Sequence, residues 1–123
     1  MTILSTGNKG LYIKQGDTGN VAFRGIPTDK NYNVFLSIYN PETNAILSEI
    51  QLVFTQSTGV ALLQINETES NALPVGDWEY GLKICYGGSE DTVLPRAYID
   101  DGGNLVRESA PAFIVDNKYV EGD

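Results

Sequence analysis

The stretch from residue 59 to residue 86 constrains the fold most, because two runs with the period of a β-strand flank a short helix signal. In the first run, Ala61, Leu63 and Ile65 recur at every second position, as on the buried face of a strand. The second run places five large side chains on one face: Trp78, Tyr80, Leu82, Ile84 and Tyr86. Since aromatic side chains dominate core packing, we expect this run to be the core strand, with Trp78 buried in it.

The segment between these two runs has the pattern of a helix start. Asn66 is suited to cap the first turn, and Glu69, three residues on, completes a capping box. The helix has to end before Leu73, because Pro74 disfavours helical geometry in the residue that precedes it. We therefore expect one short helical turn near residues 67–72.

Short alternating runs bounded by glycine, proline, asparagine or aspartate fill the rest of the chain. They lie at residues 11–14, 21–26, 32–39, 46–55, 92–99, 105–107 and 112–115. Many short strands with closely spaced turns, and no amphipathic helix, are typical of an all-β fold. The sequence predicts an antiparallel, immunoglobulin-like β-sandwich of about seven to nine strands.

We expect one domain, because 123 residues are an ordinary length for a single hydrophobic core. The polar residues 1–9 are interpreted as an N-terminal arm, residues 10–116 as the β-sandwich domain and residues 117–123 as a C-terminal tail. No run of apolar residues is long enough to insert into a membrane. The first residues also lack the pattern of a signal peptide, so we expect synthesis in the cytoplasm.

The formal net charge of −8, from 16 acidic and 8 basic residues, argues against partners with a phosphate backbone or an anionic surface. Histidine is absent, which excludes histidine-dependent nucleophilic catalysis and most catalytic zinc sites. Cys85 is the only cysteine, and we expect it to be a packed residue on the second face of the core strand. The sequence predicts no enzymatic activity, no cofactor, no metal site and no nucleic-acid partner.

Two sets of acidic residues are candidates for metal binding or catalysis. Residues 100–104 concentrate oxygen ligands, but the position of the last EF-hand glutamate is Pro111, so we interpret them as a solvated turn. Glycoside hydrolysis needs two carboxylates at a fixed separation. The candidates are Asp77, Glu79, Glu90 and Asp91, and nothing in the sequence fixes their separation.

Aromatic side chains exceed what one core face needs. The candidates for exposure are Tyr12, Tyr32, Phe35, Tyr39, Tyr98 and Tyr119. Protein interfaces are enriched in such residues, and sugar-binding β-sandwiches use them to stack on rings, so both uses stay open.

Three motifs follow one another along the chain: Q-G-D-T at residues 15–18, I-N-E-T-E-S-N-A-L-P-V-G-D-W-E-Y at residues 65–80, and A-F-I-V at residues 112–115. In this order they resemble the small immunoglobulin-like domains of tailed-bacteriophage virion proteins, such as the N-terminal domain of baseplate upper proteins. The resemblance covers about residues 11–115, although residues 92–111 are longer than the last hairpin of that family. It implies a structural virion component, in the capsid, neck, tail, baseplate or fibre attachment.

The resemblance further implies location in the virion after synthesis in the bacterial host, with other virion proteins and copies of this chain as partners. We expect the two ends and residues 92–111 to make these contacts. The candidate partner-binding residues are Ile3, Leu4, Tyr98, Tyr119 and Val120. In one alternative, the ends fold back on their own domain. In another, the chain is a carbohydrate- or cell-surface-binding module that uses exposed tyrosines.

Overall fold

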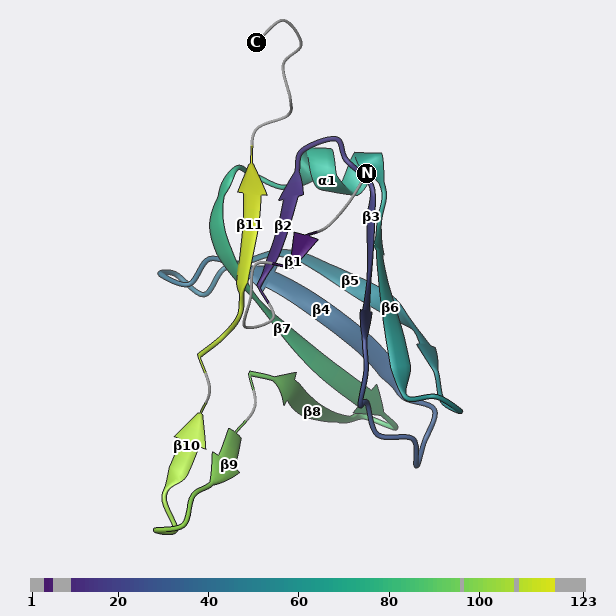
Figure 1. The fold of residues 1–123 in the computed structure, drawn as a ribbon, viewed down its shortest axis with the longest axis vertical. Coiled ribbons are helices and arrows are strands. Elements are labelled where there is room, and N and C mark those ends of the chain that lie inside the picture. The colour runs from purple at the N-terminus through teal and green to yellow at the C-terminus, as the bar shows by residue number, and fades with distance from the viewer. Residues whose placement is uncertain (1–3, 6–9, 96, 108, 117–123) are drawn as a thin grey trace, which may run out of the picture.

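The computed structural model describes residues 4–5, 10–95, 97–107 and 109–116, and consists mainly of β-strands (Figure 1). In chain order the elements are β1 (Leu4–Ser5), β2 (Leu11–Lys14), β3 (Gly19–Phe23), β4 (Asn33–Tyr39), β5 (Ile46–Thr55), β6 (Val60–Ile65), α1 (Glu67–Ala72), β7 (Gly76–Tyr86), β8 (Ser89–Leu94), β9 (Ala97–Ile99), β10 (Leu105–Arg107) and β11 (Ala112–Asp116). The described residues thus form 11 strands, more than the seven to nine expected, because β1 is added and the run predicted at residues 92–99 is divided between β8 and β9. No helix among these residues is long and apolar enough to cross a membrane.

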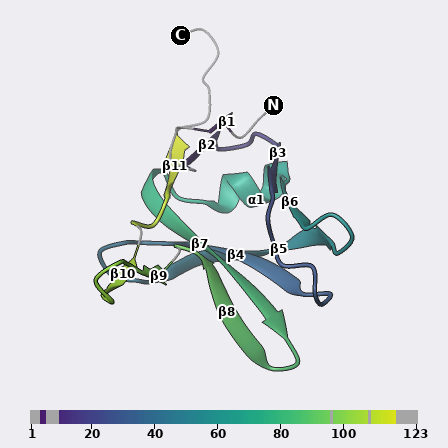
Figure 2. The same cartoon turned by 60° about the horizontal axis from the view of Figure 1, so that its bottom comes forward.

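One large sheet contains nine of the strands, in the order β1-β2-β11-β7-β4-β5-β6-β3, with β8 paired to β7 beside this path. The sheet curls so strongly that β2 and β11 come to lie across from β4 and β5, with α1 at one end of the molecule (Figures 1 and 2). Strands β9 and β10 form a separate hairpin that extends from the opposite end (Figure 1).

The pairing of β11 with β2 is parallel, whereas all other strand pairs of the described residues are antiparallel. Phe113 of β11 lies beside Leu11 of β2, and on its other side pairs with Trp78 of β7. The expectation of a wholly antiparallel fold is therefore wrong at this pair. Parallel strands need a long crossover, and here almost the whole chain separates the two strands.

The core lies inside the curved sheet and follows the predicted alternation. Val34, Leu36 and Ile38 of β4 are fully buried, and Ala61, Leu63 and Ile65 of β6 face the same interior. From β7, Tyr80, Leu82 and Ile84 join them. The period-two pattern therefore identified the buried face of each of these strands correctly.

The two outer members of the predicted β7 face do not belong to the buried core. Trp78 is only partly buried: its Nε1 donates to the Pro74 carbonyl at 2.8 Å, and its ring covers Gly76. Tyr86 is 50% exposed. Because β7 spans 11 residues, it extends past the core at both ends, and Tyr80 rather than Trp78 is the largest fully buried side chain.

Helix α1 confirms the predicted capping box and its bounds. The Asn66 side chain accepts from the Glu69 amide at 2.8 Å, and the Glu69 carboxylate accepts from the Asn66 amide at 2.9 Å. Buried Ser70 donates its hydroxyl proton to the Asp17 carbonyl at 2.6 Å, and Gln15 donates to the Leu73 carbonyl at 2.7 Å. These bonds fix the helix to the turn between β2 and β3.

Removal of this cap should destabilise the protein measurably. We expect Asn66→Ala to lower the free energy of unfolding by about 1 kcal/mol, because the Glu69 amide loses its acceptor. Urea unfolding followed by circular dichroism measures the change. Thr68→Ala, an exposed position in the same helix, is the control and should change stability little. Equal losses for the two variants would show that the cap contributes nothing specific.

Candidate functional site

A groove of about 800 Å³ opens on one side of the molecule between β3, with the residues that follow it, and β8. We call it the β3–β8 groove. Its apolar lining comes from Phe23, Ile26, Leu82, Ile84, Val93 and Leu94. In the described part of the chain, β3 pairs only with β6 and β8 only with β7, so each presents an unpaired strand edge. The groove thus combines an apolar floor with two free backbone edges.

The β3 side of the groove is held by a close backbone contact. Ile26 donates its amide proton to the Gly59 carbonyl at 3.0 Å, and its side chain is buried in the core. Gly59 has a positive φ of 68°, and a Cβ there would lie 2.7 Å from the Ile26 carbonyl oxygen. Only glycine permits this approach, which sets the position of residues 24–27.

The β8 side is set by a tight hairpin. Tyr86 of β7 pairs with Ser89 of β8, and the two glycines between them have positive φ values of 57° and 91°. Two such residues form the turn type that matches the twist of a hairpin. Both glycines tolerate positive φ, so the loop needs only two residues.

Tyr32, which lines the groove, belongs to an aromatic cluster beside it. Tyr32 lies 6.2 Å from Tyr86 and 6.4 Å from Phe54, centroid to centroid, and the Lys30 ammonium sits 5.4 Å from the Tyr86 ring. The Tyr32 hydroxyl donates to Asp29 at 2.7 Å. This hydrogen bond raises the pKa of Tyr32, as do burial and the negative charges nearby, so the phenol stays protonated at neutral pH.

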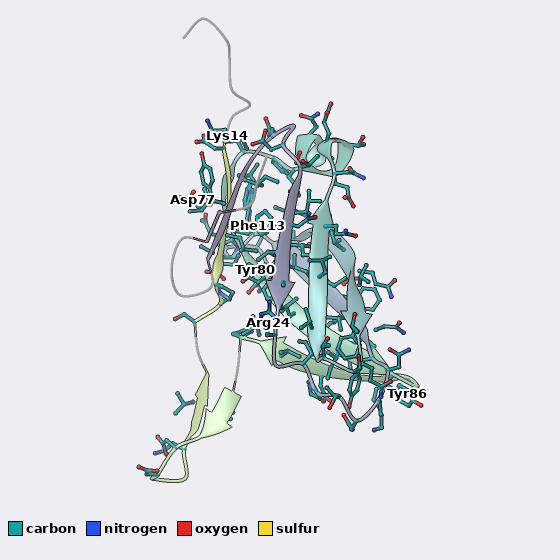
Figure 3. All side chains as sticks on the ribbon, turned by 45° about the vertical axis from the view of Figure 1, so that its right-hand side comes forward. Lys14, Arg24, Asp77, Tyr80, Tyr86 and Phe113 are labelled. Carbon is teal, nitrogen blue, oxygen red and sulfur yellow. The ribbon has the colours of Figure 1, made fainter. Side chains whose placement is uncertain are left out.

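The rims of the groove carry opposite charges. Arg24 lines the β3 side, and no hydrogen bond or ion pair engages its guanidinium within the described residues. On the other side, β8 carries the exposed carboxylates of Glu90 and Asp91, and Asp91 lines the groove. Figure 3 places Arg24 near the end of β3 and Tyr86 at the lower right of the molecule.

A second polar cluster lies on the outer face of the sheet. The Lys83 ammonium lies 3.3 Å from Glu49 and 3.5 Å from Glu90, and it covers the Phe35 ring at 5.9 Å. The hydrogen bond to Glu49 raises the pKa of Lys83. Cys85 donates its thiol proton to Glu90 at 3.8 Å, and burial together with that carboxylate raises the pKa of the thiol. A raised pKa leaves little thiolate at neutral pH.

The candidate carboxylates fall into two separate pairs. Asp77 and Glu79 lie in the first half of β7, opposite β11, whereas Glu90 and Asp91 lie opposite its second half. Glu90 pairs with Cys85, six residues from Glu79, which is about 20 Å along a strand. This separation between the pairs exceeds the 5–10 Å or so that glycoside hydrolysis uses.

The acidic turn at residues 100–104 is closed by its own carboxylate. Asp100 accepts from the amides of Gly102 and Asn104, each at 2.9 Å. Among the described residues, no group of histidine, cysteine, aspartate and glutamate side chains is arranged to hold a metal ion. The Asp100 carboxylate therefore has a structural role in this turn.

The candidate partner-binding residues do not meet in one site. Leu4 pairs with Tyr12 through the β1–β2 backbone, which joins this part of the N-terminal arm to its own domain. Tyr98 pairs with Val106 in the β9–β10 hairpin. Ile3, Tyr119 and Val120 lie outside the described residues, so their roles stay predictions.

Sequence reasoning missed the β3–β8 groove itself. Among the candidate aromatics whose side chains the structure describes, only Tyr32 lines it, whereas Tyr12 donates its hydroxyl to Asp116 at 2.8 Å and Phe35 lies on the outer face. One signal was present: Arg24 follows the alternating run of β3 and precedes a glycine and a proline. A charged side chain directly after an apolar strand indicates that this end of the strand is exposed to solvent.

The comparisons with known proteins bear on the fold. No protein-family model matches this chain, and no curated protein matches it. Among solved structures, it is similar to part of the pullulanase SAP from Group B Streptococcus, with a TM-score of 0.51 and 15% identity. The match covers 81% of this chain and 13% of that chain. At this identity the likeness concerns the architecture alone.

Proposed function

We propose that this chain is an immunoglobulin-like β-sandwich, with one parallel strand pair, that serves as a non-enzymatic structural component of a tailed-bacteriophage virion. The observation that carries the proposal is the β3–β8 groove, where two unpaired strand edges flank an apolar floor. Exposed strand edges are ready acceptors for a strand of another chain, and proteins that do not use them usually shield them. Assembly contacts are the use that this geometry supports best.

The motif order of the bacteriophage domains supports the virion as the place of assembly. Other virion proteins and copies of this chain are the proposed partners. A virion repeats each contact by symmetry, so modest single contacts add up through avidity. The charge of −8 also suits a protein that has to stay soluble at high concentration before it assembles.

Mass spectrometry of purified particles tests this proposal. We expect peptides of this chain in virions banded on a density gradient, at a constant ratio to the major capsid protein across the particle peak. An antibody raised against the recombinant chain should label the same particles. Detection in the crude lysate, with loss from the particles during banding, would contradict a virion role.

Carbohydrate binding is the second candidate, and one observation favours it. Tyr86 is half exposed in the aromatic cluster beside the groove, where its ring offers a stacking surface for a sugar. Calorimetric titration with pullulan and other glycans distinguishes the two functions. Saturable binding that Tyr86→Ala abolishes would favour the carbohydrate-binding module.

A further inference from the structure

The β3–β8 groove has the features of a binding site for one extended strand. β3 and β8 are five and six residues long, so a partner segment of about five residues would match their length. Main-chain hydrogen bonds to a free edge give such a contact its affinity, and pockets for alternate side chains give it specificity. The apolar floor formed by Leu82, Ile84 and Leu94 is suited to one large apolar side chain of the strand.

The charges around the groove limit what this strand is. Arg24 is exposed and has no partner among the described residues, so it favours an anion, whereas Asp91 on the β8 side of the groove favours a cation. A second β8 is a poor occupant, because two copies paired through this edge would bring their carboxylates together. The occupant therefore carries one apolar anchor, an acidic residue near it and a basic residue on the other side.

Residues 117–123 of this chain, N-K-Y-V-E-G-D, have this pattern. In an extended strand Tyr119 and Glu121 point to the same face, since side chains alternate. Tyr119 then meets the apolar floor while Glu121 faces Arg24. Lys118 precedes Tyr119 and brings a cation to the acidic β8 side.

The register of β7 excludes the chain's own tail from its own groove. Val115 pairs with Gly76 at the start of β7, whereas Asp91 pairs with Ile84, eight residues further on. That distance is about 26 Å at 3.3 Å per residue. Tyr119 is three residues beyond Asp116 and reaches at most about 11 Å from it. Lys14, which pairs with Asp116, accordingly lies at the other end of the molecule from Tyr86 (Figure 3).

We propose that residues 117–121 of one copy bind as a strand in the β3–β8 groove of a second copy, with Tyr119 on the apolar floor and Glu121 beside Arg24. This inference rests on the proposed assembly function and names the partner for it. The contact joins different surfaces of the two copies, so reciprocal exchange of tails produces a closed pair, and head-to-tail repetition produces a ring or an open filament. Each copy then both donates and accepts a strand.

Site-directed cross-linking between two single-cysteine chains tests this contact. In a Cys85→Ser background, Val93→Cys marks the groove and Tyr119→Cys marks the tail. We expect the oxidised mixture of the two chains to form a disulfide-linked dimer at least tenfold more than either chain alone. Thr92→Cys, exposed on the same strand, replaces Val93→Cys if that variant does not fold.

Leu105→Cys is the matched control, because it is 61% exposed on the β9–β10 hairpin and does not line the groove. It should give no more dimer with Tyr119→Cys than chance collision.

A charge reversal tests the proposed ion pair. Arg24→Glu in the acceptor should lower the dimer yield several-fold, and Glu121→Arg in the donor should restore it. A mixture that cross-links no better than the control, or Val93→Cys chains that cross-link equally well among themselves, would overturn the proposal. Because the test uses the purified chain, it can fail while the chain is still found in virions.

Discussion

Phe113→Ala is expected to lower the free energy of unfolding by about 3–5 kcal/mol, enough to unfold a marginally stable domain. Phe113 is completely buried, and its ring meets Tyr80 edge-on at a centroid distance of 6.1 Å. It also lies on β11, the strand that joins β2 to β7. Truncation therefore leaves a cavity at the one place where the parallel and antiparallel parts of the sheet meet.

Urea unfolding followed by Tyr and Trp fluorescence measures this loss. Ile114→Ala is the matched control, because Ile114 neighbours Phe113 on the same strand and is only half-buried on the other face. We expect the control to cost about 1 kcal/mol. If Phe113→Ala cost no more than Ile114→Ala, the interior of the sheet would not be packed around β11 as the structure indicates.

Local features of this fold could be predicted from the sequence because neighbouring residues determine them. The alternation in β4, β6 and β7 gave the buried faces, and Asn66 with Glu69 gave the helix start. The alternation could not show where the core ends along a strand. Trp78 and Tyr86 have the same spacing as Tyr80, but the extent of the core along β7 depends on strands far away in sequence.

The order and direction of strands were also beyond the sequence pattern. β11 is antiparallel to β7 and parallel to β2 at once, and a run of apolar residues carries no sign of either partner. The groove also results from long-range strand pairing. One edge of β7 pairs with β11 up to Glu79 and with β8 from Leu82. Arg24 and Asp91 come together only through this arrangement, so attention to the ends of the chain missed the site.

Gly59 shows how one residue far from the groove in sequence determines its shape. Gly25 and Gly59 both have positive φ, at 80° and 68°, which costs any residue with a side chain about 1–2 kcal/mol. They differ in their surroundings. A Cβ on Gly25 would meet nothing within 4 Å, whereas a Cβ on Gly59 would lie 2.7 Å from the backbone oxygen of Ile26. A backbone atom cannot move aside as the end of a side chain can.

Gly59→Ala should therefore cost about 3 kcal/mol of unfolding free energy, the sum of left-handed strain and displacement of residues 24–27. Gly25→Ala should cost only about 1 kcal/mol, because strain is its only penalty. Thermal and urea unfolding measure the loss of unfolding free energy in each variant. We expect the two losses to differ by about 2 kcal/mol, because only Gly59→Ala displaces Ile26. Gly59→Ala should also weaken strand binding in the β3–β8 groove, since Arg24 and Ile26 move with the shifted wall. Equal losses of stability in both variants would mean that left-handed backbone strain alone is responsible and that the Gly59–Ile26 contact does not shape the groove.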